Sequence, residues 1–259
     1  MNGTPYVKAE THQSITTIEF YHPQSNSLPA KLLHDLAHEI HRAGTMFETK
    51  VIILKSAGDR AFCAGASFDE LSAISNVEQG TKFFSGFAHL INAMRKCPKM
   101  IIGRIHGKCV GGGVGIAASV DYAIALDKAE VRLSELSLGF GPFVIAPAVE
   151  RKIGQGAFGA LSIDATMWRN AEWCLRKGLF SELHHSVEDM DEAVSRLAFT
   201  LSHSSAEAMA ELKHILWKGT DNWDILLSER AALSARLAIS EFSKKAIGAL
   251  SKPPVQKNK

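Results

Sequence analysis

The stretch HGKCVGGGVGIAA, residues 106–118, is unusually rich in glycine. It holds five glycines, and three of them, at 111–113, are consecutive. Apolar sequence flanks it on both sides, as MIIGRI at 100–105 and ASVDYAIA at 118–125. Glycine loses more backbone entropy on folding than any other residue, so three in a row weaken any element that contains them. The flanking pattern predicts a buried strand that ends in these glycines and a helix that begins there.

A strand that opens a helix through glycines can serve a ligand. The missing side chains let a ligand approach the backbone, and the first N–H groups of the helix point toward it. Such a turn suits an anion or a developing oxyanion. Tight packing of the helix against a strand would also require glycine, and this stretch alone does not decide between the two explanations.

A second stretch favours the ligand. RAFCAGASFDEL, residues 60–71, follows VIILKSAG at 51–58, a continuous apolar run that predicts another buried strand. Small residues occupy 64–67, just before the expected helix start at Phe68. The chain therefore offers two turns of small residues, and each can present an N–H group. An oxyanion hole needs two such donors that converge on one oxygen.

The rest of the chain predicts an α/β fold. YVKAET at 6–11 and ITTIEFYHP at 15–23 alternate as a hairpin does, and helical stripes follow at 28–44 and 81–98. Strands alternate with helices up to about residue 190, which is typical of an α/β core. From Asp191 onward the pattern is helical, and the polar tail at 252–259 predicts a loose end.

Composition excludes several function classes. A formal charge of +2 with 22% charged residues gives no strong field for nucleic acid or a membrane. No basic-then-apolar leader or membrane-length apolar run is present, and four cysteines without CxxC spacing indicate reduced thiols and a cytoplasmic setting. The histidines at 34, 38 and 41 lie opposite the apolar stripe of their helix, so we expect no metal site. GQGAFG at 154–159 lacks the preceding strand that a dinucleotide site requires.

Three segments resemble the signatures of a known family. AFCAGASFDEL at 61–71, GKCVGGGVGIAASVDYAIA at 107–125 and RLSELSLGFGP at 132–142 are similar, in this order and spacing, to the crotonase superfamily, the enoyl-CoA hydratase/isomerase family. The resemblance covers nearly the whole chain, including FYHPQSNSLP at 20–29. It implies a core of repeated ββα turns over residues 1–190 and a helical trimerisation region over 191–259. It also implies an acyl-CoA thioester as ligand, no cofactor beyond the coenzyme A of the substrate, and a homotrimer or dimer of trimers.

The same resemblance implies roles for individual residues. Glu135 matches a catalytic carboxylate, and the backbone N–H groups of Ala66 and Gly112 match the oxyanion-hole donors. Substrate contacts are implied for the adenine-side residues Ala64, Ser67 and Phe68, the pantetheine-side residues Gln24 and Ser25, and for Gly111, Pro142 and Phe143.

Two positions depart from the family. Hydratases carry a second glutamate two residues past the triple glycine, where this chain has Gly115. Phe143 stands where some dienoyl isomerases have an aspartate, and many hydratases have glycine at this position, directly after the proline that corresponds to Pro142. The site is therefore expected to have one acid–base group and a bulky apolar wall.

One carboxylate restricts the chemistry without fixing it. It suffices to move a proton between carbons, which is isomerisation, and it supports hydration if another group orients the water. We therefore expect hydration or double-bond isomerisation of an enoyl-CoA, straight or branched, in fatty-acid or amino-acid degradation. Two alternatives stay open: a decarboxylase or dehydratase that acts on a carrier-protein-bound thioester, and a non-catalytic acyl-CoA-binding paralogue in which Glu135 only starts a helix.

Overall fold

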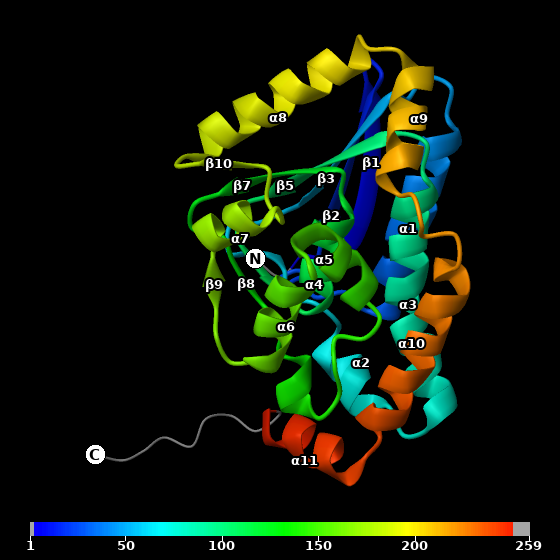
Figure 1. Ribbon diagram of the computed structural model, residues 1–259, viewed down its shortest axis with the longest axis vertical. Helices are drawn as coiled ribbons and strands as arrows, with labels where there is room; N and C mark the ends of the chain where they lie inside the picture. Colours follow the sequence, from blue (N-terminus) through cyan, green and yellow to red (C-terminus); the bar gives the residue numbers. More distant parts are fainter. Residues whose placement is uncertain (1–2, 251–259) are drawn as a thin grey trace.

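The computed structural model describes residues 3–250, so the tail predicted at 252–259 lies outside the described residues. A six-stranded sheet forms the centre of the fold (Figure 1). Its first two strands are antiparallel, as the predicted hairpin requires, and every other pairing in this sheet is parallel. In spatial order the strands are β1 (Tyr6–His12), β2 (Ile15–Tyr21), β3 (Val51–Ser56), β5 (Met100–Ile105), β7 (Tyr122–Leu126) and β10 (Glu182–His184).

A second, smaller sheet of four short strands lies beside the six-stranded sheet. It contains β4 (Ala61–Cys63), β6 (Lys108–Val110), β8 (Glu130–Arg132) and β9 (Arg169–Asn170). Each turn of the core uses one strand of the large sheet, one of the small sheet and then a helix, in the series β3–β4–α2, β5–β6–α4 and β7–β8–η1. The expected α/β core of repeated ββα turns is thereby confirmed, and each turn places the end of a short strand beside the next.

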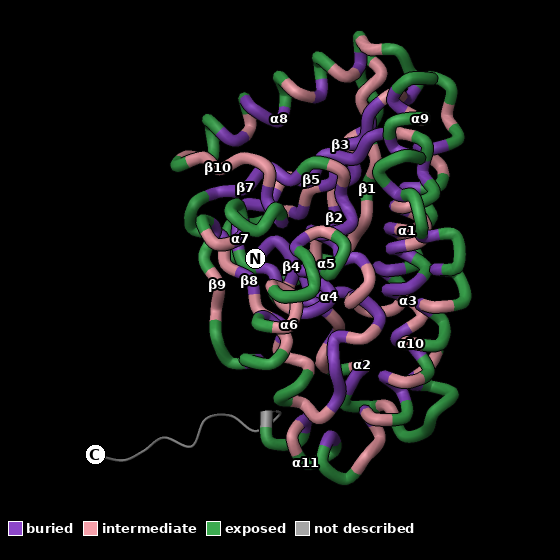
Figure 2. Tube along the Cα trace, viewed as in Figure 1, coloured by how far each residue is buried: buried purple, intermediate pink, exposed green. Residues whose placement is uncertain are grey.

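Helices surround these sheets and join their turns. α4 differs from the others because all eight of its residues are buried (Figure 2). GQGAFG lies at the junction of two helices and not after a strand, so it is no dinucleotide turn. The helices of this part are α1 (Ala30–Thr45), α2 (Phe68–Ala73), α3 (Val77–Lys96), α4 (Gly112–Ser119), the 3₁₀ helix η1 (Glu135–Leu138), α5 (Ala146–Ile153), α6 (Gln155–Ile163) and α7 (Ala171–Lys177).

The C-terminal part is helical, as expected. It consists of α8 (Val187–Ser202), α9 (Ala206–Leu216), α10 (Trp223–Ala238) and α11 (Glu241–Leu250). The expected division at residue 190 falls inside α8, which packs on β3, β5 and β7 of the large sheet. α10 runs along α3, and α11 returns to contact η1 and α2 (Figure 1).

A buried ion pair ties these helices to the core. Lys213 on α9 lies 2.8 Å from the Asp121 carboxylate, and both side chains are almost fully buried. The Asp121 carboxylate also accepts hydrogen bonds from the indole of Trp217 and from the backbone amide of Ile101. No helix within residues 3–250 is long and apolar enough to cross a bilayer.

Candidate active site

Two loops from adjacent ββα turns meet at the centre of the site. Gly111 has φ +52° and ψ −118°, and Gly65 has φ +88°, so both backbones favour glycine. A β-carbon on Gly65 would lie 2.6 Å from the carbonyl oxygen of Val110 and 3.4 Å from the amide nitrogen of Gly112. The loop after β4 and the loop after β6 are therefore in direct backbone contact.

Each loop presents an amide without an acceptor. The Leu28 amide donates to the carbonyl oxygen of Gly65, and the Ser67 amide donates to the carbonyl oxygen of Leu28. The Ala66 amide, which lies between these two bonds, has no acceptor among the described residues. Gly112 is the first residue of α4, so its amide has no intrahelical acceptor. Neither amide donates to another group within residues 3–250.

The triple glycine is required both for tight packing of α4 and for an amide that is open to a ligand, the two explanations that the sequence left open. A β-carbon on Gly112 would lie 2.1 Å from Cε1 of Phe87, and one on Gly113 would lie 2.3 Å from the carbonyl oxygen of Cys63. These two glycines are required for close packing of α4. Gly111 has its unusual backbone at the point where the helix opens into the cavity, so the same turn packs tightly and exposes an amide.

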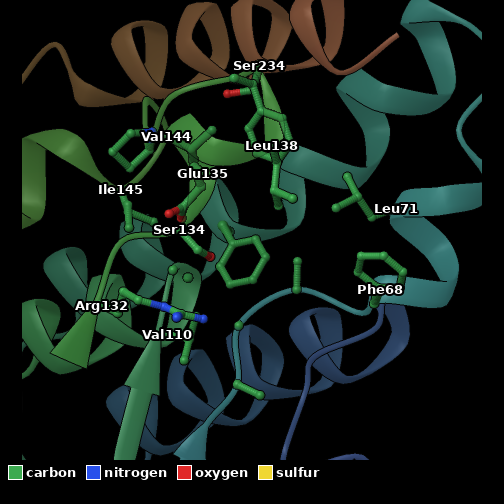
Figure 3. Close-up of a pocket in the computed structure, with 18 of the residues that line it drawn as sticks. Phe68, Leu71, Val110, Arg132, Ser134, Glu135, Leu138, Val144, Ile145 and Ser234 are labelled. Carbon is green, nitrogen blue, oxygen red and sulfur yellow. The ribbon is translucent and has the colours of Figure 1, made fainter. Parts of the chain in front are cut away.

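Glu135 starts η1 and points to this turn (Figure 3). A β-carbon on Gly111 would lie 2.7 Å from its Oε1, so the carboxylate rests against the glycine itself. The residue is partly exposed as a whole, but its Oε2 is buried and has no hydrogen-bond partner within the described residues. Burial raises the pKa of Glu135 to about 7, against the opposite effects of the backbone amides of Glu135 and Ser134 and of the Arg132 charge.

A cavity of about 680 Å³ connects these groups. Most of the predicted site residues line it, namely Gln24, Ser25, Ala64, Ala66, Phe68, Gly111, Gly112, Glu135, Pro142 and Phe143. Ser67 does not, because it is buried as the N-cap of α2 and its Oγ accepts a hydrogen bond from the Glu70 amide at 3.3 Å. Its side chain holds the start of the helix, so the expected contact of Ser67 with the ligand stays a prediction that its backbone would have to fulfil.

The loop at 24–26 is held in place by Asn26, a residue that the sequence analysis did not single out. The side-chain amide of Asn26 donates to the carbonyl oxygens of Ala57 (2.7 Å) and Ala61 (2.9 Å). In the same loop, the Ser25 carbonyl oxygen accepts a hydrogen bond from the Ala64 amide at 3.1 Å. The only available signal was the type of residue, since asparagine tolerates the positive φ of 56° found here.

Other missed residues form the apolar wall. Phe84 and Phe87 of α3 have the helical spacing of core residues and are buried, and they also line the cavity. Ile145 occupies the space beside Gly115, where a β-carbon would lie 2.5 Å from its Cγ2. An apolar side chain thus fills the region in which a second carboxylate would have to lie.

The remaining reactive side chains have other roles. No three His, Cys, Asp or Glu side chains gather to hold a metal within residues 3–250. Burial raises the pKa of the Cys63 thiol to about 12 and that of Cys109 well above its usual value, so both stay protonated. Asp69 also lines the cavity and accepts a hydrogen bond from the Gln24 side chain at 2.9 Å, whereas Glu150 is exposed on α5.

The chain is similar to known proteins in sequence. The sequence model of the enoyl-CoA hydratase/isomerase family matches residues 10–248. The chain is 24% identical over 217 residues to the (7aS)-7a-methyl-1,5-dioxo-2,3,5,6,7,7a-hexahydro-1H-indene-carboxyl-CoA hydrolase of Mycobacterium tuberculosis, with 82% of this chain and 84% of that protein covered. It is 26% identical over 206 residues to a probable enoyl-CoA hydratase of Bacillus subtilis, with 79% of each covered.

A solved structure shows the same fold. The enoyl-CoA hydratase of Bacillus halodurans superposes with a TM-score of 0.87 at 22% sequence identity, and the match covers 94% of this chain and 99% of that one.

Proposed function

The chain belongs to the enoyl-CoA hydratase/isomerase family, and on this basis we propose that it isomerises an enoyl-CoA double bond with Glu135 as its only carboxylate acid–base group. One observation carries the proposal. A buried carboxylate with an unpartnered oxygen lies against Gly111, in the same cavity as the free amides of Ala66 and Gly112.

The two amides bind the thioester. Its carbonyl oxygen accepts hydrogen bonds from Ala66 and Gly112, and negative charge that develops on this oxygen strengthens both bonds. The partial positive charge at the N-terminus of α4 acts in the same direction. These contacts favour the enolate over the ground state, which is what lowers the barrier.

Glu135 then moves one proton. In a 3-enoyl thioester its carboxylate removes a proton from C2, and the electron pair spreads into a dienolate held by the two amides. The protonated Glu135 returns the proton at C4, while a double bond forms between C2 and C3. A pKa near 7 makes the group suitable for both steps, because neither the acid nor the base form is strongly favoured at neutral pH.

Hydration is the second candidate. It is supported by the printed name of the Bacillus subtilis relative, a probable enoyl-CoA hydratase. Isomerisation is preferred because Ile145, an apolar residue, stands beside Gly115 where a second carboxylate would orient the water. A hydratase reaction would require Glu135 alone to take a proton from water and give it to C2.

The test is the Glu135→Gln variant, assayed on matched 2-enoyl and 3-enoyl thioesters of coenzyme A. The amide keeps the shape and removes the proton transfer, so we expect kcat to fall by about 10²–10⁴-fold while thioester binding changes little. Glu150→Gln is the control, because that carboxylate is exposed on α5, and its rates should match those of the wild type. Undiminished turnover by Glu135→Gln would reject Glu135 as the acid–base group, and loss in both variants would point to general damage.

A further inference from the structure

One cation, Arg132, lines the cavity without a close ion-pair partner among residues 3–250, although its charge acts on Glu135. Arg132 ends β8, lines the cavity and lies three residues before Glu135. Its Nε is buried and has no hydrogen-bond partner, and its guanidinium forms no ion pair within residues 3–250. Withdrawing a charged donor from water is costly unless an acceptor replaces the water. An anionic ligand in the cavity would supply that acceptor.

The surroundings of Arg132 fix its position. Its Cζ lies 4.6 Å from the centre of the Trp168 ring, and Lys108 Nζ lies 4.4 Å from the same ring. The two cations differ in one respect: Lys108 is neutralised by Glu130 at 3.0 Å, whereas Arg132 is not. Stacking on an aromatic ring holds a guanidinium in place and leaves its N–H edge available.

Arg132 lies on the same side of the cavity as Glu135. Figure 3 shows Arg132 and Glu135 extending from one side, and Phe68 and Leu71 from the other. The loop that ends at Phe68 is the one expected to hold coenzyme A, and the thioester oxygen lies at the amides of Ala66 and Gly112. With the thioester placed as proposed, an acyl chain that continues past this point would extend along the side of the cavity that carries Glu135 and Arg132.

We infer that Arg132 binds a carboxylate carried by the acyl chain, so that the substrates are thioesters of dicarboxylic enoic acids. The planar guanidinium can donate two parallel hydrogen bonds to a carboxylate, which gives both energy and orientation. This inference rests on the proposed function for the placement of the thioester. The same guanidinium could bind a phosphate of coenzyme A, and the experiment separates these two sources of negative charge.

The test measures binding and not turnover. Dissociation constants are determined by calorimetry for the saturated succinyl, glutaryl and adipyl thioesters of coenzyme A, which have no double bond to isomerise, each against its monocarboxylic counterpart, and for free coenzyme A. We expect at least one dicarboxylic thioester to bind the wild type about tenfold or more tightly than its counterpart, which corresponds to about 1.4 kcal/mol. Arg132→Met should abolish this preference, and Arg132→Lys should retain part of it.

The control is Lys108→Met, which removes the other cation on Trp168 and should leave the preference unchanged. Absence of any dicarboxylic preference in the wild type would overturn the inference even if no variant could be purified. Equal weakening of both thioester classes by Arg132→Met would also overturn it, since that indicates a structural role. Weaker binding of free coenzyme A by Arg132→Met would assign the residue to a phosphate instead. Because no turnover is needed, failure of the isomerase proposal would appear separately, in the Glu135→Gln assay.

Discussion

Glu135 is an ordinary residue type made reactive by its position. Burial removes water from the carboxylate and disfavours its charged form, while the nearby Arg132 and two backbone amides only partly restore it. The resulting pKa of about 7 lies where a carboxyl group can both accept and return a proton.

This pKa predicts the pH dependence of the reaction. Removal of the C2 proton needs the ionised carboxylate, so kcat/KM for a 3-enoyl thioester should rise with pH and level off above about 7. Well below that pH the rate should fall about tenfold per pH unit, because the ionised fraction falls by that factor. The measurement is kcat/KM between pH 5 and 9. A rate that instead decreases through pH 7 would indicate that the neutral acid is needed, as when it protonates an enolate formed by decarboxylation.

The sequence could predict Glu135 but not Arg132. Glu135 was found because its segment resembles a family signature that also contains both amide donors. Arg132 carried no such signal, since an arginine at the end of a short strand is normally a solvated residue. Its guanidinium lies over the ring of Trp168, which belongs to the connection between α6 and β9. A contact across that distance in the chain leaves no trace in local periodicity.

At the scale of elements, the long apolar segments were predicted and the short ones were not. The buried runs at 51–58 and 100–105 became β3 and β5. β6 and β8 have three residues each, which is too short for alternation to show. α3 begins at Val77, four residues before the expected start, because Asn76 caps it by accepting a hydrogen bond from the Gln79 amide at 2.9 Å.

The first turn of α4 allows a test of the amide at Gly112. Proline fits the first position of a helix and replaces the amide hydrogen with a ring carbon, but any β-carbon here would collide with Phe87. The test is therefore made in a Phe87→Leu background, which lacks the ring atoms Cε1 and Cζ. There we expect Gly112→Ala to retain most activity and Gly112→Pro to lower kcat by about 10²–10³-fold. Equal rates for these two variants, measured on one thioester, would remove the Gly112 amide from the oxyanion hole.

The packing of α4 against α5 determines whether a second carboxylate can be introduced. In Gly115→Glu the new β-carbon would lie 2.5 Å from Cγ2 and 2.7 Å from Cβ of Ile145, so we expect a loss of about 1–3 kcal/mol in unfolding free energy. Adding Ile145→Gly removes both atoms. The double variant should then hydrate a 2-enoyl thioester faster than Ile145→Gly alone, as measured by kcat/KM. If the single Gly115→Glu variant were as stable in urea as the wild type, the Ile145 side chain would have to move aside at little cost in free energy.

At the scale of the whole molecule, the C-terminal helices cover some of the core and expose apolar side chains of their own. α10 packs along α3, but Ile215 on α9 is 65% exposed and Ile225 on α10 is 67% exposed. Leu212 and Leu216 on α9 are exposed as well. Exposed apolar side chains that gather on one helix, as Leu212, Ile215 and Leu216 do on α9, are typical of a surface that another protein chain covers.

The family resemblance implies a homotrimer or a dimer of trimers, and we predict that its subunits meet on α9 and α10. Light scattering at micromolar concentration should give a mass of three or six chains, and Ile215→Lys with Ile225→Lys should lower that mass, because two buried charges would replace apolar contacts. Phe47→Lys is the matched control, since Phe47 is 99% exposed and lies in the loop after α1. A monomeric wild type would contradict the prediction. An intact oligomer in the double variant would instead place the interface at a second exposed pair, Ile163 on α6 and Phe242 on α11. Because α6 and α11 both contact η1, a partner bound there would lie close to the cavity that Glu135 lines.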